Sequence, residues 1–183
     1  YTGDFLIDPT MTGAYDMDLG KIAYVGKQGV LAMLCESRFS EHTGHTSPNH
    51  RLTSFFKYTI NHADKRMIFT VLPTHLYSLQ DIFNGAENTH RKIVLMGKQL
   101  QNIVNFAIKE NYLHNQDGLL GDLSNIEDND SILIVTDDRQ NPYANISKIL
   151  GNYDKFIKLR STDTIVFAEP RYDSNEKTFV KLE

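Results

Sequence analysis

The sequence has little cysteine and no long apolar run, and each scarcity excludes a class of protein. The single cysteine, Cys35, cannot form an intrachain disulfide, and its place inside an apolar run predicts a buried thiol in a reducing, cytoplasmic compartment. The longest charge-free apolar run, residues 29–35, is far shorter than the roughly 20 residues that span a bilayer. No transmembrane helix and no membrane partner are therefore expected.

An excess of positive charge is missing as well. The 183 residues include 19 basic and 23 acidic side chains, a net charge of −4, so a nucleic acid would have to meet a local basic surface. With 40% hydrophobic and 23% charged residues, the composition is that of one soluble globular domain and excludes a disordered or fibrous chain. The chain opens at Tyr1 without a leader sequence, and we interpret it as a piece of a longer protein.

The apolar residues are grouped in a way that predicts the fold. Short continuous runs rich in Val, Ile and Leu are typical of parallel strands covered on both faces, and they occupy residues 29–35, 67–72, 92–96, 131–135 and 164–168. Amphipathic stretches predict helices over residues 18–28, 51–62, 76–87, 99–110 and 145–150. The alternation predicts an α/β fold, a doubly wound and mostly parallel sheet with helices on both faces.

Two further charge patterns complete the reading along the chain. Residues 117–130 carry five acidic residues and no basic one, which predicts a solvated connector. Basic residues gather in two stretches that we interpret as solvated helix faces rather than as a nucleic-acid surface. These stretches contain His50, Arg51, Lys57, Lys65 and Arg66 in one, and Lys148, Lys155, Lys158 and Arg160 in the other.

Ligands of open parallel sheets bind beyond the carboxyl ends of the strands, so the segments that follow the predicted strands are the places to look for a site. Polar or charged residues follow each of them, among them Glu36, His75, Lys98, Gln99 and Arg139. Strand-to-helix loops are polar in any fold of this class, so the placement alone leaves the function open.

Several motifs resemble one family. Residues 2–10, TGDFLIDPT, resemble the segment of bacterial ribonuclease J enzymes that carries a metal-bridging aspartate. Residues 29–31 leading to Glu36, and the following residues 43–46, TGHT, are similar to the strand and loop that open the family's β-CASP region. Residues 97–105, GKQLQNIVN, resemble the family's Gly-Arg-Ser-Met-x-Asn-Val-Val-Asn, and residues 165–177 resemble the strand and Asn-Glu-Lys turn that close the region.

The resemblance implies a β-CASP domain inserted in a metallo-β-lactamase-type nuclease. Residues 1–16 would then end the metallo-β-lactamase core segment, residues 17–170 would form the β-CASP domain, and residues 171–183 would begin the return to the core. The parent protein would hydrolyse RNA phosphodiesters in RNA processing and decay with two zinc ions. Its expected partners are single-stranded RNA, the rest of the core in the parent chain, and further copies or paralogues in a homo- or hetero-oligomer.

The resemblance also implies roles for individual residues. Asp4 corresponds to the metal ligand, and Glu36 to the catalytic acid that orients a metal-binding histidine. His75, Lys98, Gln99 and Arg139 are the expected RNA contacts. The chain departs from the family where residues 137–142 read DDRQNP in place of Gly-Ser-Gln-Gly-Glu-Pro, and where a lysine replaces the arginine at position 98.

A His-x-His pair is absent from the sequence. The superfamily builds its zinc site on a His-x-His-x-Asp-His cluster, so the 183-residue chain alone is expected to be inactive and to bind no zinc. The nearest approach to a ligand group, His42 and His45 beside Glu41, is interpreted as a polar surface loop. The alternatives are a divergent non-catalytic scaffold or interaction domain, and a free-standing flavodoxin-like module, which would need a glycine-rich loop before a helix.

Overall fold

The structure is a computed structural model that describes residues 1–3, 5, 7–8, 16–37, 40–41, 43–44, 52–136, 143–168 and 176–182. The chain divides into two compact units, Tyr1–Arg51 and Leu52–Glu183, and each is described by itself. We refer to them as unit 1 and unit 2. The predicted domain boundaries at residues 16/17 and 170/171 concern the parent protein and stay a prediction.

Unit 2 contains a four-stranded sheet in which every pair of neighbours is parallel. The strands are β1 (Met67–Thr70), β2 (Lys92–Met96), β3 (Ser131–Val135) and β4 (Thr164–Phe167), and their order is β2-β3-β1-β4. Each residue of β1 and β3 is buried, as expected for strands covered on both faces. Four of the five predicted strands are thus confirmed.

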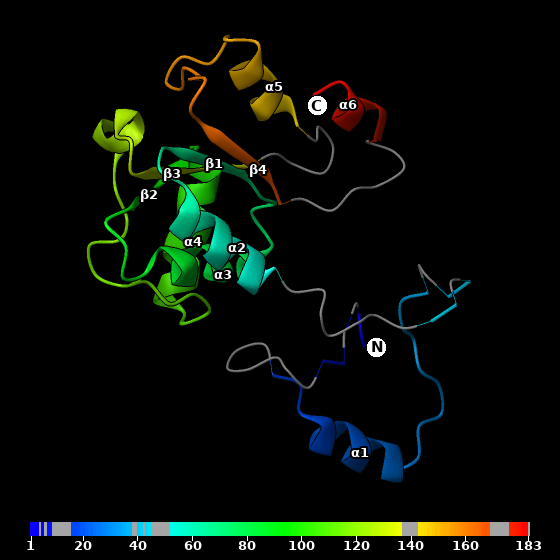
Figure 1. Cartoon of the computed structure of the whole chain (residues 1–183). Helices are drawn as coiled ribbons and strands as arrows, with labels where there is room; N and C mark the ends of the chain where they lie inside the picture. Colours follow the sequence, from blue (N-terminus) through cyan, green and yellow to red (C-terminus); the bar gives the residue numbers. More distant parts are fainter. Residues whose placement is uncertain are drawn as a thin grey trace. The chain divides into compact units, whose positions relative to one another are not determined.

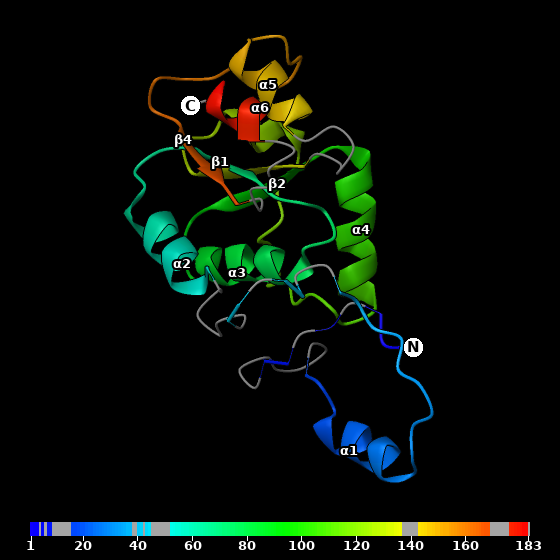
Figure 2. The same cartoon turned by 90° about the vertical axis from the view of Figure 1, so that its right-hand side faces the viewer.

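Helices cover both faces of this sheet (Figures 1 and 2). On one face, side chains of Met67 and Phe69 pack with α2 (Thr53–His62), α3 (Leu76–Ala86) and α4 (Lys98–Lys109). On the other face, Ile68 packs with the 3₁₀ helix η3 (Leu123–Glu127), α5 (Ala144–Leu150) and α6 (Glu176–Val180). Because successive side chains of a strand point to opposite faces, the continuous apolar runs supply both layers of the core. The predicted doubly wound α/β fold is confirmed.

Helices α2 and α3 lie in close contact. A Cβ atom at Gly85 of α3 would come within 2.8 Å of the terminal methyl group of Ile60 on α2, so glycine lets the two helices approach without moving that side chain. Near the start of α2, the hydroxyl of Thr53 donates to the buried carboxylate of Asp81 at 2.9 Å. The contacts advance along both helices in the same direction, so α2 and α3 begin at the same end of unit 2.

The acidic segment 117–130 is not the solvated connector that its charges predict. Leu120 forms a parallel bridge with Ile93, which adds a rudimentary strand to the outer edge of β2. The segment then forms η3, capped by Asp122, and the Ile126 side chain of η3 is buried in the core. The prediction counted the charges and overlooked the widely spaced apolar residues, of which Leu119 and Ile126 are buried while the acidic residues are exposed.

Arg66 is also placed differently from its prediction as a solvated basic residue, because its side chain is only 1% exposed. Its guanidinium donates to both carboxylate oxygens of Asp163, at 3.0 and 2.6 Å, and to the carbonyl oxygens of Ile126 and Lys158. Arg66 and Asp163 directly precede β1 and β4, so this buried pair joins the amino ends of two paired strands. Buried charges need such partners because water no longer solvates them.

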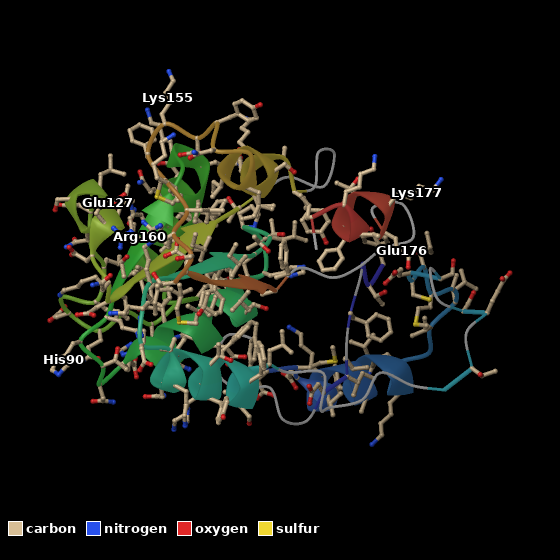
Figure 3. The ribbon with its side chains drawn as sticks, turned by 45° about the horizontal axis from the view of Figure 1, so that its top comes forward. His90, Glu127, Lys155, Arg160, Glu176 and Lys177 are labelled. Atoms are coloured by element: carbon tan, nitrogen blue, oxygen red, sulfur yellow. The ribbon has the colours of Figure 1, made fainter. Side chains whose placement is uncertain are left out.

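A second, more exposed ion pair extends this network. Arg160 donates to the carboxylate of Glu127, and the two labelled side chains lie together in Figure 3. Lys158 also donates, to the carbonyl oxygens of Asn152 and Asp154. Three basic residues that were predicted to be a solvated face, Arg66, Lys158 and Arg160, are therefore bonded to unit 2 itself.

The described residues of unit 1 form one helix, α1 (Leu19–Lys27), in which the backbone N–H of Lys21 donates to the Asp18 side chain at the N-cap. The prediction of a strand over residues 29–35 is wrong. Among the described residues of unit 1, the pairing of this segment is limited to a single parallel bridge between Cys35 and Gly3. Leu31 is fully exposed, and Cys35 is exposed rather than buried. A buried strand needs neighbours along its edges and on both faces, and the described residues of unit 1 supply only that bridge.

Across the ranges that the structure describes, no helix has both the length and the apolar character needed to cross a bilayer.

The buried pair at the amino ends of the strands yields a prediction for stability. Asp163→Asn removes the charge that compensates buried Arg66, so we expect the free energy of unfolding to fall by about 3 kcal/mol in a urea titration followed by circular dichroism. The control is Glu127→Gln, which removes the more exposed of the two carboxylates near Arg66, 3.6 Å from its Nη1; because the Glu127 side chain is 60% exposed, its loss costs less than about 1 kcal/mol. Equal losses for the two variants would contradict the assignment of the buried pair.

Candidate functional site

The carboxyl ends of the four strands meet at one edge of unit 2. Thr70 of β1 is in register with Val135 of β3 and Phe167 of β4, and Met96 of β2 is in register with Val135. The residues that follow these positions therefore lie side by side, at strand spacings of about 4.8 Å. We call this the carboxyl edge, and it is where open parallel sheets bind their ligands.

Helix amino-termini converge on the carboxyl edge. β2 is joined to α4 by one residue, Gly97, whose φ of 100° lies in the region that favours glycine. The first turns of α3 and α4 contain no acidic residue, and neither N-cap residue, His75 or Gly97, makes a side-chain capping hydrogen bond. The dipoles of the two helices give this edge a positive potential, which suits an anionic ligand.

Three of the predicted RNA contacts lie at this edge. Lys98 and Gln99 are the first two residues of α4, and both are exposed. His75 is the partly exposed N-cap residue of α3. Since α3 follows β1 and α4 follows β2, with β3 between these strands, the structure brings the three residues to one edge from two different helices. Arg139 lies outside the described residues.

One residue at the carboxyl edge was missed by the sequence analysis. The side-chain amide of Asn145, on α5, donates to the backbone carbonyl of Thr136 at 2.7 Å. This bond ties α5 to the end of β3 and holds the two ends of the connection between them together. The polar residue at the first position of the helix predicted over residues 145–150 was the available signal, and its partner is a backbone atom that no sequence pattern reveals.

The two acidic candidates belong to unit 1. Glu36 is exposed and directly follows Cys35, whose bridge partner is Gly3. Gly3 in turn directly precedes Asp4, which lies outside the described residues. The bridge therefore joins the two residues that directly precede the predicted acids, Asp4 and Glu36.

The described residues do not by themselves form a metal centre. No group of three or more His, Cys, Asp or Glu side chains is placed to hold a metal ion in the described parts of either unit. His42 and His45 lie outside the described residues. Imidazole and carboxylate ligands must surround a divalent ion at about 2 Å, and the described residues alone do not provide such a set.

Comparison with known proteins gives the family. The family model described as "Ribonuclease J, beta-CASP domain" matches residues 64–182. The chain belongs to the ribonuclease J β-CASP family. Its match begins just before β1 and ends after α6, so it covers the whole sheet and all helices of unit 2 except α2. Membership confirms the resemblance and replaces the alternative of a free-standing flavodoxin-like module.

Similarity to curated ribonuclease J proteins extends over nearly the whole chain. The chain is 26% identical to Ribonuclease J2 of Bacillus subtilis over 98% of its own length and 33% of that protein. It is 28% identical to Ribonuclease J of Synechocystis over 92% of its length and 27% of the relative, and 23% identical to Ribonuclease J of Thermus thermophilus over 97% and 31%. The chain thus spans about one third of the length of the relatives it matches.

Proposed function

We propose that the parent of this chain is a metal-dependent ribonuclease of the cytoplasm, and that unit 2 closes over single-stranded RNA with its carboxyl edge. The observation that carries the proposal is the convergence of two helix amino-termini and Lys98 at this edge, in a chain of the ribonuclease J β-CASP family. Phosphate groups bind where backbone amides and a cationic side chain face the same space.

The proposal gives each candidate residue a chemical role. Lys98 attracts a backbone phosphate, and Gln99, His75 and Arg139 contact the RNA chain along the carboxyl edge. Asp4 contributes a carboxylate to the metal centre, which residues of the parent beyond this chain complete. Two zinc ions bound there would supply an activated water and stabilisation of the charge on the phosphate. Glu36 positions a histidine ligand of that centre. The oligomeric state of the parent stays a prediction.

Unit 1 needs a partner, and we assign this role to the remaining metallo-β-lactamase-type part of the parent. No residue of α1 is buried, although Ile22 and Val25 form an apolar face on this helix. These side chains, with Val30 and Met33, line a largely apolar hollow of about 710 Å³. A nine-residue helix is not stable in water without packing, so the hollow is suited to side chains from the rest of the parent.

Metal dependence is tested on the full-length parent. We expect RNA degradation, followed on a denaturing gel, to stop on addition of a chelator and to return with zinc, because the proposed water is activated by metal. Asp4→Ala should reduce the rate at least a hundredfold, whereas Asp16→Ala, an exposed acid of the same unit, should leave it unchanged. Degradation that persists with chelator contradicts the metallonuclease assignment, and a parent with no degradation at all supports the scaffold alternative.

The carboxyl edge is tested by RNA binding. Lys98→Ala should weaken binding of a single-stranded RNA oligonucleotide and reduce the slope of log K against log salt by about 0.7, the value expected for one lost phosphate contact. The matched control is Lys109→Ala at the opposite end of α4, which should change neither quantity. Fluorescence anisotropy at several salt concentrations measures both. An equal effect of the two variants would indicate only a general loss of charge.

The role of unit 1 predicts a difference in protease sensitivity. In the isolated chain, trypsin should cut rapidly at Lys21 and Lys27 on α1, while the sheet of unit 2 is protected. In the full-length parent, the same sites should be cut much more slowly because packing holds the helix folded. Mass spectrometry of the fragments locates the cuts. Equal cleavage rates in both proteins would show that the parent does not cover α1.

A further inference from the structure

A cavity of about 240 Å³ opens at the outer edge of β2, between α4 and the segment that leads into η3. Its base contains the buried residues Val94 and Leu95 of β2. Polar side chains and apolar side chains share the walls, and the complete lining is Val94, Leu95, Gln101, Asn105, Leu120, Gly121, Asp122 and Leu123.

The backbone of Leu95 presents an unused donor to this cavity. Ile93 bonds outward, donating to Leu119 O at 2.9 Å and accepting from Gly121 N at 2.8 Å. By strand alternation, Leu95 directs its backbone groups to the same outer edge, and its carbonyl oxygen accepts from Gln101 Nε2 at 3.0 Å. Among the described residues no hydrogen bond joins the Leu95 N–H to an acceptor, and Leu95 as a residue is only 6% exposed. Such a buried donor favours a ligand with an acceptor atom.

The rudimentary strand stops before it reaches Leu95. The chain turns away from the edge of β2 at Asp122, because the carboxylate of this residue caps η3 and accepts from the backbone N–H of Ser124 at 2.7 Å. Gly121 makes this turn possible, since a Cβ atom there would come within 2.7 Å of the Asn125 amide oxygen. The cavity is therefore the space that the strand would have filled if it had continued.

Hydrogen-bond acceptors line the same space. The bonds from Ser124 involve one carboxylate oxygen of Asp122, so the second oxygen remains available. These bonds lower the pKa of Asp122, so its side chain is charged at neutral pH. Gln101 bonds Leu95 through its nitrogen and keeps its oxygen, and the exposed amide of Asn105 offers both a donor and an acceptor. Leu120 and Leu123 supply apolar surface beside these groups.

We infer that this cavity binds a nucleobase of single-stranded RNA that carries an amino group next to a ring acceptor, as adenine and cytosine do. The ring nitrogen accepts from Leu95 N–H, and the amino group donates to Asp122 or to the Gln101 oxygen. Side-chain amides, carboxylates and backbone amides read the edges of splayed bases in this way. The volume lies below the range of about 300–1,000 Å³ for drug-sized ligands and suits one planar base.

The inference rests on the proposed function and extends it from phosphate contacts to base recognition. Lys98 and Gln101 are one helical turn apart at the start of α4, so a nucleotide whose phosphate meets Lys98 has its base near the cavity. A peptide strand adding to β2 is disfavoured because it would need the carbonyl of Leu95 as well as its N–H, and Gln101 already bonds that carbonyl.

A direct test follows the Leu95 amide by NMR in the ¹⁵N-labelled chain. Titration with adenosine 5′-monophosphate should shift the Leu95 amide signal. Purine riboside 5′-monophosphate, which keeps the ring acceptor and lacks the amino group, should bind about fivefold more weakly, because one hydrogen bond is lost. A Leu95 signal that responds equally to both ligands, or to neither, overturns the inference.

Variants of the cavity supply an independent test with oligoadenylate and oligouridylate, measured by fluorescence anisotropy. Asn105→Ala and Asp122→Asn should each weaken oligoadenylate binding about fivefold and leave oligouridylate binding unchanged. Asparagine is as good an N-cap as aspartate, so Asp122→Asn preserves η3. Asn102→Ala is the control, an exposed residue of the same helix outside the cavity, and should change nothing. Thermal melting checks that each variant is folded.

The outcomes separate the inference from the proposed function. If both oligonucleotides bind equally, the cavity variants have no effect and Lys98→Ala still weakens binding, base recognition is wrong and the RNA-binding edge stands. If no variant changes binding, or no RNA binds at all, both are wrong. If the cavity variants change self-association of the chain and leave RNA binding unaffected, the edge of β2 is a protein interface and the inference is overturned.

Discussion

The parallel, in-register pairing of the four strands is the constraint on which the rest of unit 2 depends. Because Thr70, Val135 and Phe167 are aligned across the sheet, each connection must return to the same starting end, and helices α3 and α4 begin where β1 and β2 stop. Backbone dipoles of separate helices are thereby added at one edge. The single residue between β2 and α4 makes this coupling tight, since the first turn of α4 cannot move independently of the strand.

The fold was predictable from the sequence where local pattern and tertiary environment agree. β2 and β3 have the predicted bounds, because continuous apolar runs are covered on both faces. The segment 29–35 has the same pattern without the same environment, since the described part of unit 1 gives it one bridge and no covering layer. The prediction for Arg66 was wrong for the converse reason. Its charge suggested a side chain exposed to water, but its partner Asp163 lies 97 residues further along the chain, beyond any local pattern.

The sequence predicted which residues lie at the carboxyl edge of the sheet, but it did not predict the residues that line the cavity beside β2. The rule that ligands bind beyond strand ends selected His75, Lys98 and Gln99, and the structure brings all three to the carboxyl edge. Gln101, Asn105 and Asp122 were not selected, because they face the outer edge of β2 and not its end. What brings them together is the early departure of the rudimentary strand at Gly121, which depends on a capping hydrogen bond and not on periodicity.

The buried pair of Arg66 and Asp163 sits at the amino ends of β1 and β4, opposite to the helix amino-termini that make the carboxyl edge attractive to anions. The ion pair that stabilises the fold and the helix termini that suit an anion thus lie at opposite ends of the strands. Exchanges of glycine for aspartate such as those that distinguish residues 137–142 from the family pattern leave this buried pair unchanged. In such an architecture, residues at the carboxyl edge can be substituted during evolution without loss of the interactions that keep unit 2 folded.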